Sequence, residues 1–153
     1  MIYNTAYVQT APIGAIQGAL KALVNAVGQE DRKRAMEALE DAVNQGPQAE
    51  QPLTHHFTEG LYGREILNPK GSLIVTKTHK EHNFSFVMRG HLLVITEEGH
   101  FEIKAPKWFT TKPGTKRILY AIEETVFVTV HPNPTNTEDT QFLENRLATK
   151  ERV

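Results

Sequence analysis

Three basic side chains on two predicted strands are the residues best placed to do chemistry. Side chains alternate between the two faces of a strand, so Lys77 and His79 point the same way. Leu73 and Val75 share that face, and we expect it to line the interior of a small barrel. Arg117 lies on a later predicted strand. Ammonium, imidazole and guanidinium groups gathered at one barrel mouth would bind a carboxylate or a phosphate.

An internal ion pair is the alternative for these cations. Glu65 or Glu102 would then neutralise them inside the molecule, and the cluster would be structural rather than a ligand site.

The histidines offer a second kind of site. His79 and His82 form an H-x-x-H pair near a predicted turn, and His56 or His131 would complete a set of metal ligands. On a strand that ends in a turn, such a pair places its rings on different faces unless the turn bends them together. A structural role for these histidines, hydrogen-bonded at the barrel rim, is the alternative.

Composition excludes several classes of protein. The chain has 153 residues, a net charge of −1 and no cysteine. The lack of cysteine excludes disulfides, thiolate nucleophiles and Cys-ligated metal clusters. The balanced charge does not provide the positive field that nucleic-acid or anionic-membrane binding needs. Polar residues interrupt the apolar segment 11–27, and no basic region precedes it. We therefore expect no signal peptide, no membrane span and no secretion.

The residue pattern divides the chain into four segments. We expect an N-terminal helical hairpin over 1–46, a linker over 47–53, a β-barrel over 54–133 and a C-terminal helix with its tail over 134–153. The first helix carries apolar residues at helical spacing up to Val27, and the second runs from about Glu30 to Asn44. A capping box at Thr135–Glu138 is expected to start the last helix.

Short runs rich in Val, Ile, Thr and Phe predict antiparallel strands in the third segment. They lie near Leu61–Leu67, Ser72–His79, Phe84–Arg89, His91–Thr96, His100–Lys104, Lys107–Thr111, Arg117–Ile122 and Thr125–His131. His55-His56 is expected to precede the first strand. The predicted fold class is mainly β, a cupin-like jelly roll or small antiparallel β-barrel, with an N-terminal helical hairpin and a C-terminal helix.

The spacing of five of these residues resembles the first motif of the cupin superfamily. In that motif a glycine is followed by His-x-His, a glutamate and a second glycine. The matching positions are Gly71, Lys77, His79, Asn83 and Gly90. The run 106–121 resembles the second motif, with Gly114 in place and Arg117 where the family has its last histidine. The resemblance covers roughly residues 54–132 and implies a cupin barrel.

The departures from the cupin pattern bear on function. Cupin metal sites use three histidines and a glutamate, and the resemblance places Lys77, His79, Asn83 and Arg117 at those positions. Only His79 is a usual ligand. A guanidinium keeps its proton in proteins and cannot bind a metal, and a lysine adds a second positive charge. We therefore expect no metal at the standard position and no cofactor, with His56, His79, His82 and His131 as the fallback ligands.

A narrower resemblance is to small cupin-like proteins encoded by tailed bacteriophages. It rests on the runs His55-His56-Phe57, Arg64-Glu65, Pro113-Gly114-Thr115-Lys116-Arg117, Tyr120-Ala121 and Glu124-Thr125-Val126, with His79 and His82. It implies a viral source, a place in the virion or the host cytoplasm, and other phage structural proteins as partners, but no reaction. We also expect a homo-oligomer, with the N-terminal helices at a contact between subunits.

Three functions fit these patterns. The sequence favours a non-catalytic binding or assembly module, although it leaves open whether the protein is an enzyme. The second is a metal-dependent cupin enzyme, of the dioxygenase or isomerase type, that uses the fallback histidines. The third is a metal-free sugar-phosphate epimerase-like cupin, with His79 as base, Tyr120 or Tyr62 as acid, and Lys77 with Arg117 as the phosphate clamp.

Overall fold

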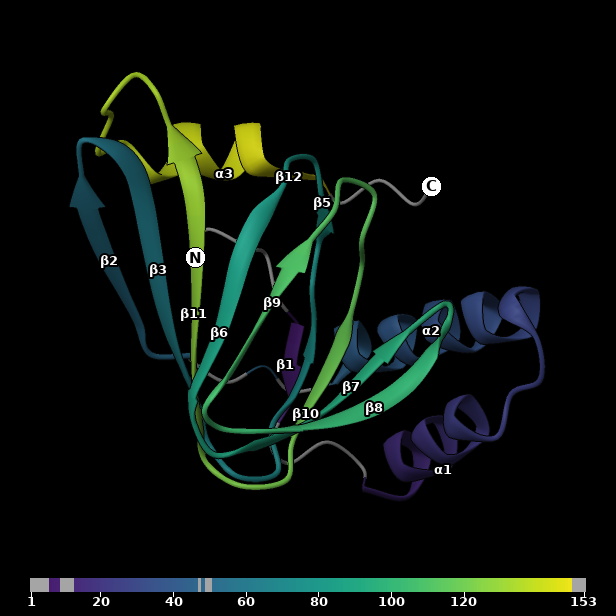
Figure 1. Ribbon diagram of the computed structural model, residues 1–153. Coiled ribbons are helices and arrows are strands. Elements are labelled where there is room, and N and C mark those ends of the chain that lie inside the picture. The colour runs from purple at the N-terminus through teal and green to yellow at the C-terminus, as the bar shows by residue number, and fades with distance from the viewer. Residues whose placement is uncertain (1–5, 9–12, 47, 49–50, 150–153) are drawn as a thin grey trace.

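Two five-stranded antiparallel sheets make up most of the fold (Figure 1). The computed structural model describes residues 6–8, 13–46, 48 and 51–149. One sheet has the strand order β1-β4-β10-β7-β8, the other has β2-β3-β11-β6-β9, and β12 pairs with β5. The strands are β1 Ala6–Val8, β2 Leu53–Thr58, β3 Gly60–Asn68, β4 Leu73–Val75, β5 Thr78–His79, β6 Asn83–Arg89, β7 His91–Thr96, β8 Gly99–Lys104, β9 Lys107–Thr111, β10 Ile118–Ala121, β11 Thr125–Asn133 and β12 Ala148–Thr149. The helices are α1 Ile13–Val24, α2 Gln29–Gln45 and α3 Thr140–Leu147.

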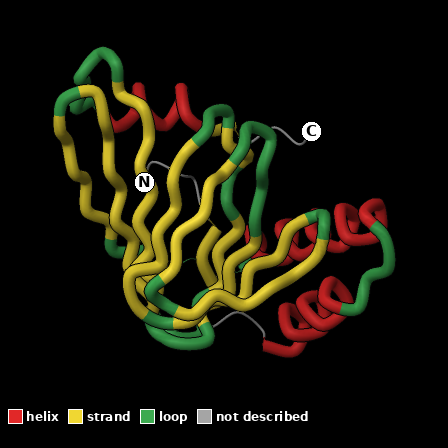
Figure 2. The backbone as a smooth tube through the Cα atoms, in the orientation of Figure 1, coloured by secondary structure: helices red, strands yellow, loops and turns green. Residues whose placement is uncertain are grey.

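The space between the two sheets holds the main apolar core. It is filled from alternate strand positions by Ile66, Ile74, Val87, Leu92, Val94, Ile103, Leu119 and Phe127. Figure 2 shows the strands forming the body of the molecule and the helices lying outside it. The arrangement confirms the predicted mainly β class, with antiparallel sheets and helices at both ends.

The helical hairpin covers the outer face of the first sheet, on the side away from β2 and β3 (Figure 1). The apolar faces of α1 and α2 pack there against β4, β7 and β10 through Leu23, Met36, Leu39, Val43, Leu73, Val75, Ile95 and Ile118. Among the residues described, no helix is both long enough and apolar enough to cross a membrane.

This packing corrects the predicted facing of β4. Leu73 and Val75 face the helices, and Ile74 takes the position between the sheets. All three side chains are buried because the sheet is covered on both faces, so the strand shows no alternation of apolar and polar residues. Leu119 and Phe127 also face the space between the sheets.

The first strand of the second sheet was not predicted. His55 and His56 lie inside β2, which pairs with β3 from Leu53 opposite Ile66 to Thr58 opposite Leu61. The exposure of β2 alternates regularly, but two adjacent histidines occupy the middle of the strand, and the linker composition of the preceding run hides its start. β1 was also missed.

The start of α3 differs from the prediction. Its N-cap is Asp139, whose carboxylate accepts hydrogen bonds from the backbone N–H groups of Gln141 and Phe142, each at 3.1 Å. The predicted capping box at Thr135–Glu138 is therefore wrong. Asn136 instead adopts a left-handed conformation in a turn, with φ of 51°.

The last helix covers one end of the barrel (Figure 1). Leu143 and Leu147 pack against Phe57 and Tyr62 of the second sheet, and β12, which follows directly, pairs with β5. The helix and β12 therefore bridge elements of both halves of the barrel at this end.

The helix-facing side of β4 gives a test of the fold. Val75 is 2% exposed, so Val75→Asp should lower the free energy of unfolding by about 3–5 kcal/mol, because a buried unpaired carboxylate is costly. Val27 is 82% exposed, so Val27→Asp is the matched control and should leave stability unchanged. Urea unfolding measures both, and equal unfolding curves for the two variants would contradict the packing.

Gly90 gives a second test. It joins β6 to β7 with φ of +94°, and a Cβ at this position would lie 2.2 Å from the carbonyl oxygen of Glu124. Gly90→Ala should therefore lower the melting temperature strongly, since the backbone itself must move. Gly18→Ala in α1 meets no atom within 4 Å and should be neutral or stabilising by up to about 1 kcal/mol. A Gly90→Ala variant as stable as Gly18→Ala would rule out the close approach.

Candidate functional site

A small polar cavity lies between the two sheets, beside the apolar core. Its volume is about 30 Å³, which is enough for a group the size of one or two water molecules. Its polar walls come from both sheets and from the segments that join their strands, and include Gln51, Arg64, Asn68, His79, Ser85 and Arg117. Among the described residues that line it, none is acidic.

Arg117 is a buried charged group of this cavity. It is 9% exposed, its Nη1 donates to Thr111 Oγ1 at 2.8 Å, and its guanidinium lies 5.0 Å from the centre of the Phe109 ring. Its Nε has no hydrogen-bond partner among the described residues. Burial lowers the pKa of Arg117 to about 10, so the group is still a cation at neutral pH.

A chain of hydrogen bonds leads from Arg117 to His79. Thr111 Oγ1 accepts from Arg117 and lies 3.3 Å from Ser85 Oγ. Ser85 in turn donates to Asn83 Oδ1 at 3.1 Å, and Asn83 Nδ2 lies 3.3 Å from His79 Nδ1. An amide nitrogen can only donate, so His79 Nδ1 accepts from Asn83 Nδ2 at the end of the chain.

The contact with Asn83 determines the tautomer of His79. An imidazole that accepts at Nδ1 carries its single proton at Nε2, where it can donate to a further group. Burial, together with the charges of Arg117 and Arg64, lowers the pKa of His79 to about 4. His79 is therefore a neutral hydrogen-bond donor at neutral pH.

Arg64 was not predicted as a site residue, although it lines the same cavity. It lies on β3 and is 2% exposed, and its charge contributes to the lowered pKa values of His79 and His131. Arg64 lies on the same face of β3 as the buried residues Tyr62 and Ile66, since alternate residues of a strand share a face. That spacing is the sequence signal that would have placed Arg64 in the interior.

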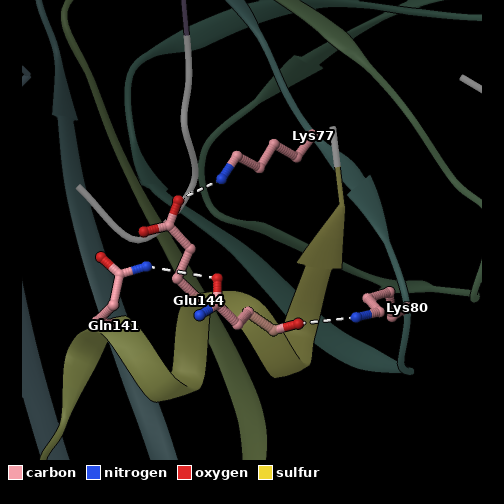
Figure 3. A network of polar contacts seen from close by, with 5 residues as sticks. Lys77, Lys80, Gln141 and Glu144 are labelled. Carbon is pink, nitrogen blue, oxygen red and sulfur yellow. Dashed lines mark hydrogen bonds and ion pairs between the residues drawn. The ribbon is translucent and has the colours of Figure 1, made fainter. Parts of the chain in front are cut away.

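Lys77 does not join the cavity. The strand predicted over Ser72–His79 breaks between β4 and β5, at Thr76 and Lys77. Even-numbered residues face the interior up to Thr76, whereas beyond the break the odd-numbered His79 lines the cavity. Lys77 instead points toward α3 and forms an ion pair with Glu144 (Figure 3). The structure therefore brings together His79 and Arg117 of the predicted cationic cluster, but not Lys77.

The two acids considered as internal partners are engaged elsewhere. Glu65 lies 3.0 Å from His56 Nε2, and Glu102 lies 2.8 Å from His91 Nε2. Neither lines the cavity. The acid that neutralises a predicted site residue is Glu144, on a helix whose position relative to the barrel no local pattern indicates.

The side chains at the cupin ligand positions do not fit a metal ion. Arg117 is a cation, Lys77 is paired with Glu144, and Asn83 is held between Ser85 and His79. A divalent ion there would meet positive charge and a single imidazole. In the part of the chain that the structure describes, no group of three or more His, Cys, Asp or Glu residues could hold a metal.

The fallback histidines are not gathered either. His131 is buried, stacks on Tyr62 at 5.9 Å and lies 2.8 Å from Thr129 Oγ1. Burial, the charge of His79 and that of Arg64 lower its pKa to about 3. His56 and His82 are exposed, so only His79 and His131 are close enough to interact.

Comparison with known proteins gives a likeness of fold. No protein-family model and no curated protein matches the sequence. Similar solved structures include an ectoine synthase from P. lautus, at 15% identity over 57% of this chain and 67% of that chain, with a TM-score of 0.49. An RmlC-like cupin family protein from Methanocaldococcus jannaschii is 15% identical over 56% of this chain and 84% of its own, with a TM-score of 0.48. A cupin domain from Bordetella pertussis is 20% identical over 57% and 97%, with a TM-score of 0.46. At these values the likeness carries nothing about activity, and the link to phage proteins stays a prediction.

The two buried histidines predict acid sensitivity. An unfolded histidine has a pKa of 6.5, against about 4 for His79 and about 3 for His131 in the folded protein. Between these values the unfolded state binds more protons, so the free energy of unfolding falls as the pH falls below 6.5. The slope approaches about 1.4 kcal/mol per pH unit for each histidine.

Urea unfolding at pH 7.5, 6.0 and 5.0 measures this slope. His131→Gln should make it shallower, and His82→Gln, at an exposed position, should not change it. A parent protein whose stability is constant over this pH range would contradict the neutral buried imidazoles.

Proposed function

We propose that this chain is a non-catalytic, cupin-like binding module that takes a small carboxylate or oxyanion into the cavity between its sheets. The observation that carries the proposal is charge. Two buried arginines, Arg64 and Arg117, line a cavity in which none of the described lining residues is acidic. An anion would supply a counter-charge for Arg117, whose Nε has no hydrogen-bond partner among the described residues.

The hydrogen-bond inventory of the cavity supports the same ligand. Arg117 Nε and Asn68 Nδ2 are buried donors without partners among the described residues. Gln51 Oε1 is the one lining acceptor without a partner in that part of the chain. Buried donors left unpaired cost free energy, and the two oxygens of a carboxylate can accept from both.

The chemistry of His79 favours binding over catalysis. A general base works best with a pKa near the operating pH, and that of His79 is about 4. The residue that orients its ring is Asn83, an amide that cannot stabilise an imidazolium as a carboxylate does. The acids considered for an epimerase lie elsewhere. The Tyr62 hydroxyl is 2.7 Å from His55 Nδ1, and Tyr120 packs toward the helices.

Assembly is a separate part of the proposal. The homo-oligomer and the place in a phage particle rest on the sequence. Leu20 and Leu23 already pack on the chain's own sheet. The expected subunit contact through α1 and α2 would therefore use other surfaces of these helices. Val27, beyond the end of α1, is 82% exposed.

Anion binding is tested by calorimetry with formate, acetate and inorganic phosphate. We expect acetate to bind and to raise the melting temperature, with higher affinity at pH 5.5 than at pH 7.5. The sign follows from linkage, because a bound anion offsets the arginine charges and raises the pKa of His79, so binding takes up a proton. The pKa of His79 followed by NMR should rise when acetate is added.

Two variants check where the anion binds. Arg117→Met should abolish binding while leaving the melting temperature equal or higher, since an apolar side chain replaces a buried cation. Arg89→Gln is the matched control, because Arg89 pairs with Glu124 at the surface. Absence of any anion effect on the parent protein, or stoichiometric zinc that EDTA removes with loss of stability, would overturn the proposal.

A further inference from the structure

A second, larger hollow lies beside the edge strands β8 and β9. It has a volume of about 570 Å³ and is lined from β8, β9 and the segment before β10 by Phe101, Ile103, Lys104, Lys107, Phe109 and Arg117, with Glu102 and Thr110. These two strands are the edges of different sheets and diverge from the turn that joins them (Figure 1). Arg117 also lines the small inner cavity, so one guanidinium belongs to both spaces.

The floor of this cleft is apolar. Phe101 and Ile103 occupy alternate positions of β8 and therefore share a face, and Ile103 is part of the core between the sheets. Phe109 of β9 packs on the same core. Phe101 is nevertheless 45% exposed, so a large aromatic ring lines the cleft without being covered.

The charges around the cleft favour an anionic group at its inner end. Lys104 and Lys107 lie on its walls, and Arg117 lines both the cleft and the inner cavity. Its acid among the described residues, Glu102, is 2.8 Å from His91 Nε2. The Arg117 guanidinium lies over the Phe109 ring, so charge and apolar surface are adjacent.

We infer that the ligand of this protein is an amphipathic carboxylic acid, whose apolar body lies on Phe101, Ile103 and Phe109 while its carboxylate reaches Arg117. The inference rests on the proposed anion-binding function and names its ligand class. The inner cavity accommodates one small group, whereas the cleft has the volume of a pocket for an ordinary small molecule. Sugar phosphates and inorganic anions would leave the apolar floor exposed to water.

Calorimetry with three probes tests this ligand class. Phenylacetate should bind at least roughly tenfold more tightly than acetate, because its ring is buried on the cleft floor. Phenylacetamide, which has the same shape without the charge, should not bind measurably. Phe101→Ala should reduce the ratio of phenylacetate to acetate affinity toward one. Phe142→Ala is the matched control, since Phe142 is 49% exposed on α3, and should keep the ratio of the parent.

The outcomes separate the two proposals. If acetate binds and phenylacetate binds no more tightly, the cleft is not part of the site and this inference is wrong, while the anion function stands. If neither acid binds, the anion function itself is wrong. Tight binding of phenylacetamide would show an apolar site that does not use Arg117. Nuclear Overhauser contacts between the phenyl protons and Phe101 would locate the ring independently of any variant.

Discussion

The buried positive charge of Arg117 determines the character of the interior of this protein. A guanidinium cannot accept a hydrogen bond or lose its proton at neutral pH, so it donates to Thr111, and hydrogen bonds continue from there through Ser85 and Asn83 to His79. The same charge, added to burial and to Arg64, keeps His79 neutral with its remaining proton at Nε2. One buried cation thereby disfavours the binding of a metal ion, helps to lower the pKa of His79 and provides hydrogen-bond donors for an anion.

The helices cover two parts of the barrel around that arrangement. The helical hairpin covers the outer face of the first sheet, and α3 packs over the end where a cupin-like mouth was expected. The ion pair between Lys77 and Glu144 belongs to this closure and removes a second positive charge from the cavity. The hollow beside Arg117 lies instead between the edges of β8 and β9, where the two sheets separate.

The chain also shows which parts of a cupin-like pattern depend on the backbone and which depend on chemistry. A Cβ at position 90 would collide with the carbonyl oxygen of Glu124. The fold therefore requires glycine at this position, whatever the site binds. The places of the usual ligands carry no such constraint. Asn83 and Arg117 fit the barrel interior as well as ligands would, because the network that ends at His79 satisfies their polar atoms in part.

The sequence by itself determined the mainly β class, most strand positions, the helices at both ends and the entry of His79 and Arg117 into one site. These follow from short-range patterns, since the alternation of side chains and turn residues acts within a few positions. It did not determine the facing of Leu73 and Val75, the place of Lys77 or the role of Arg64. Burial on both faces removes the alternation of apolar and polar residues from β4. The break between β4 and β5 then changes which alternate residues face the interior, before His79 is reached. The partner of Lys77 lies 67 positions away, on α3. Only tertiary packing decides such contacts, because their energies depend on which surfaces the folded chain brings together.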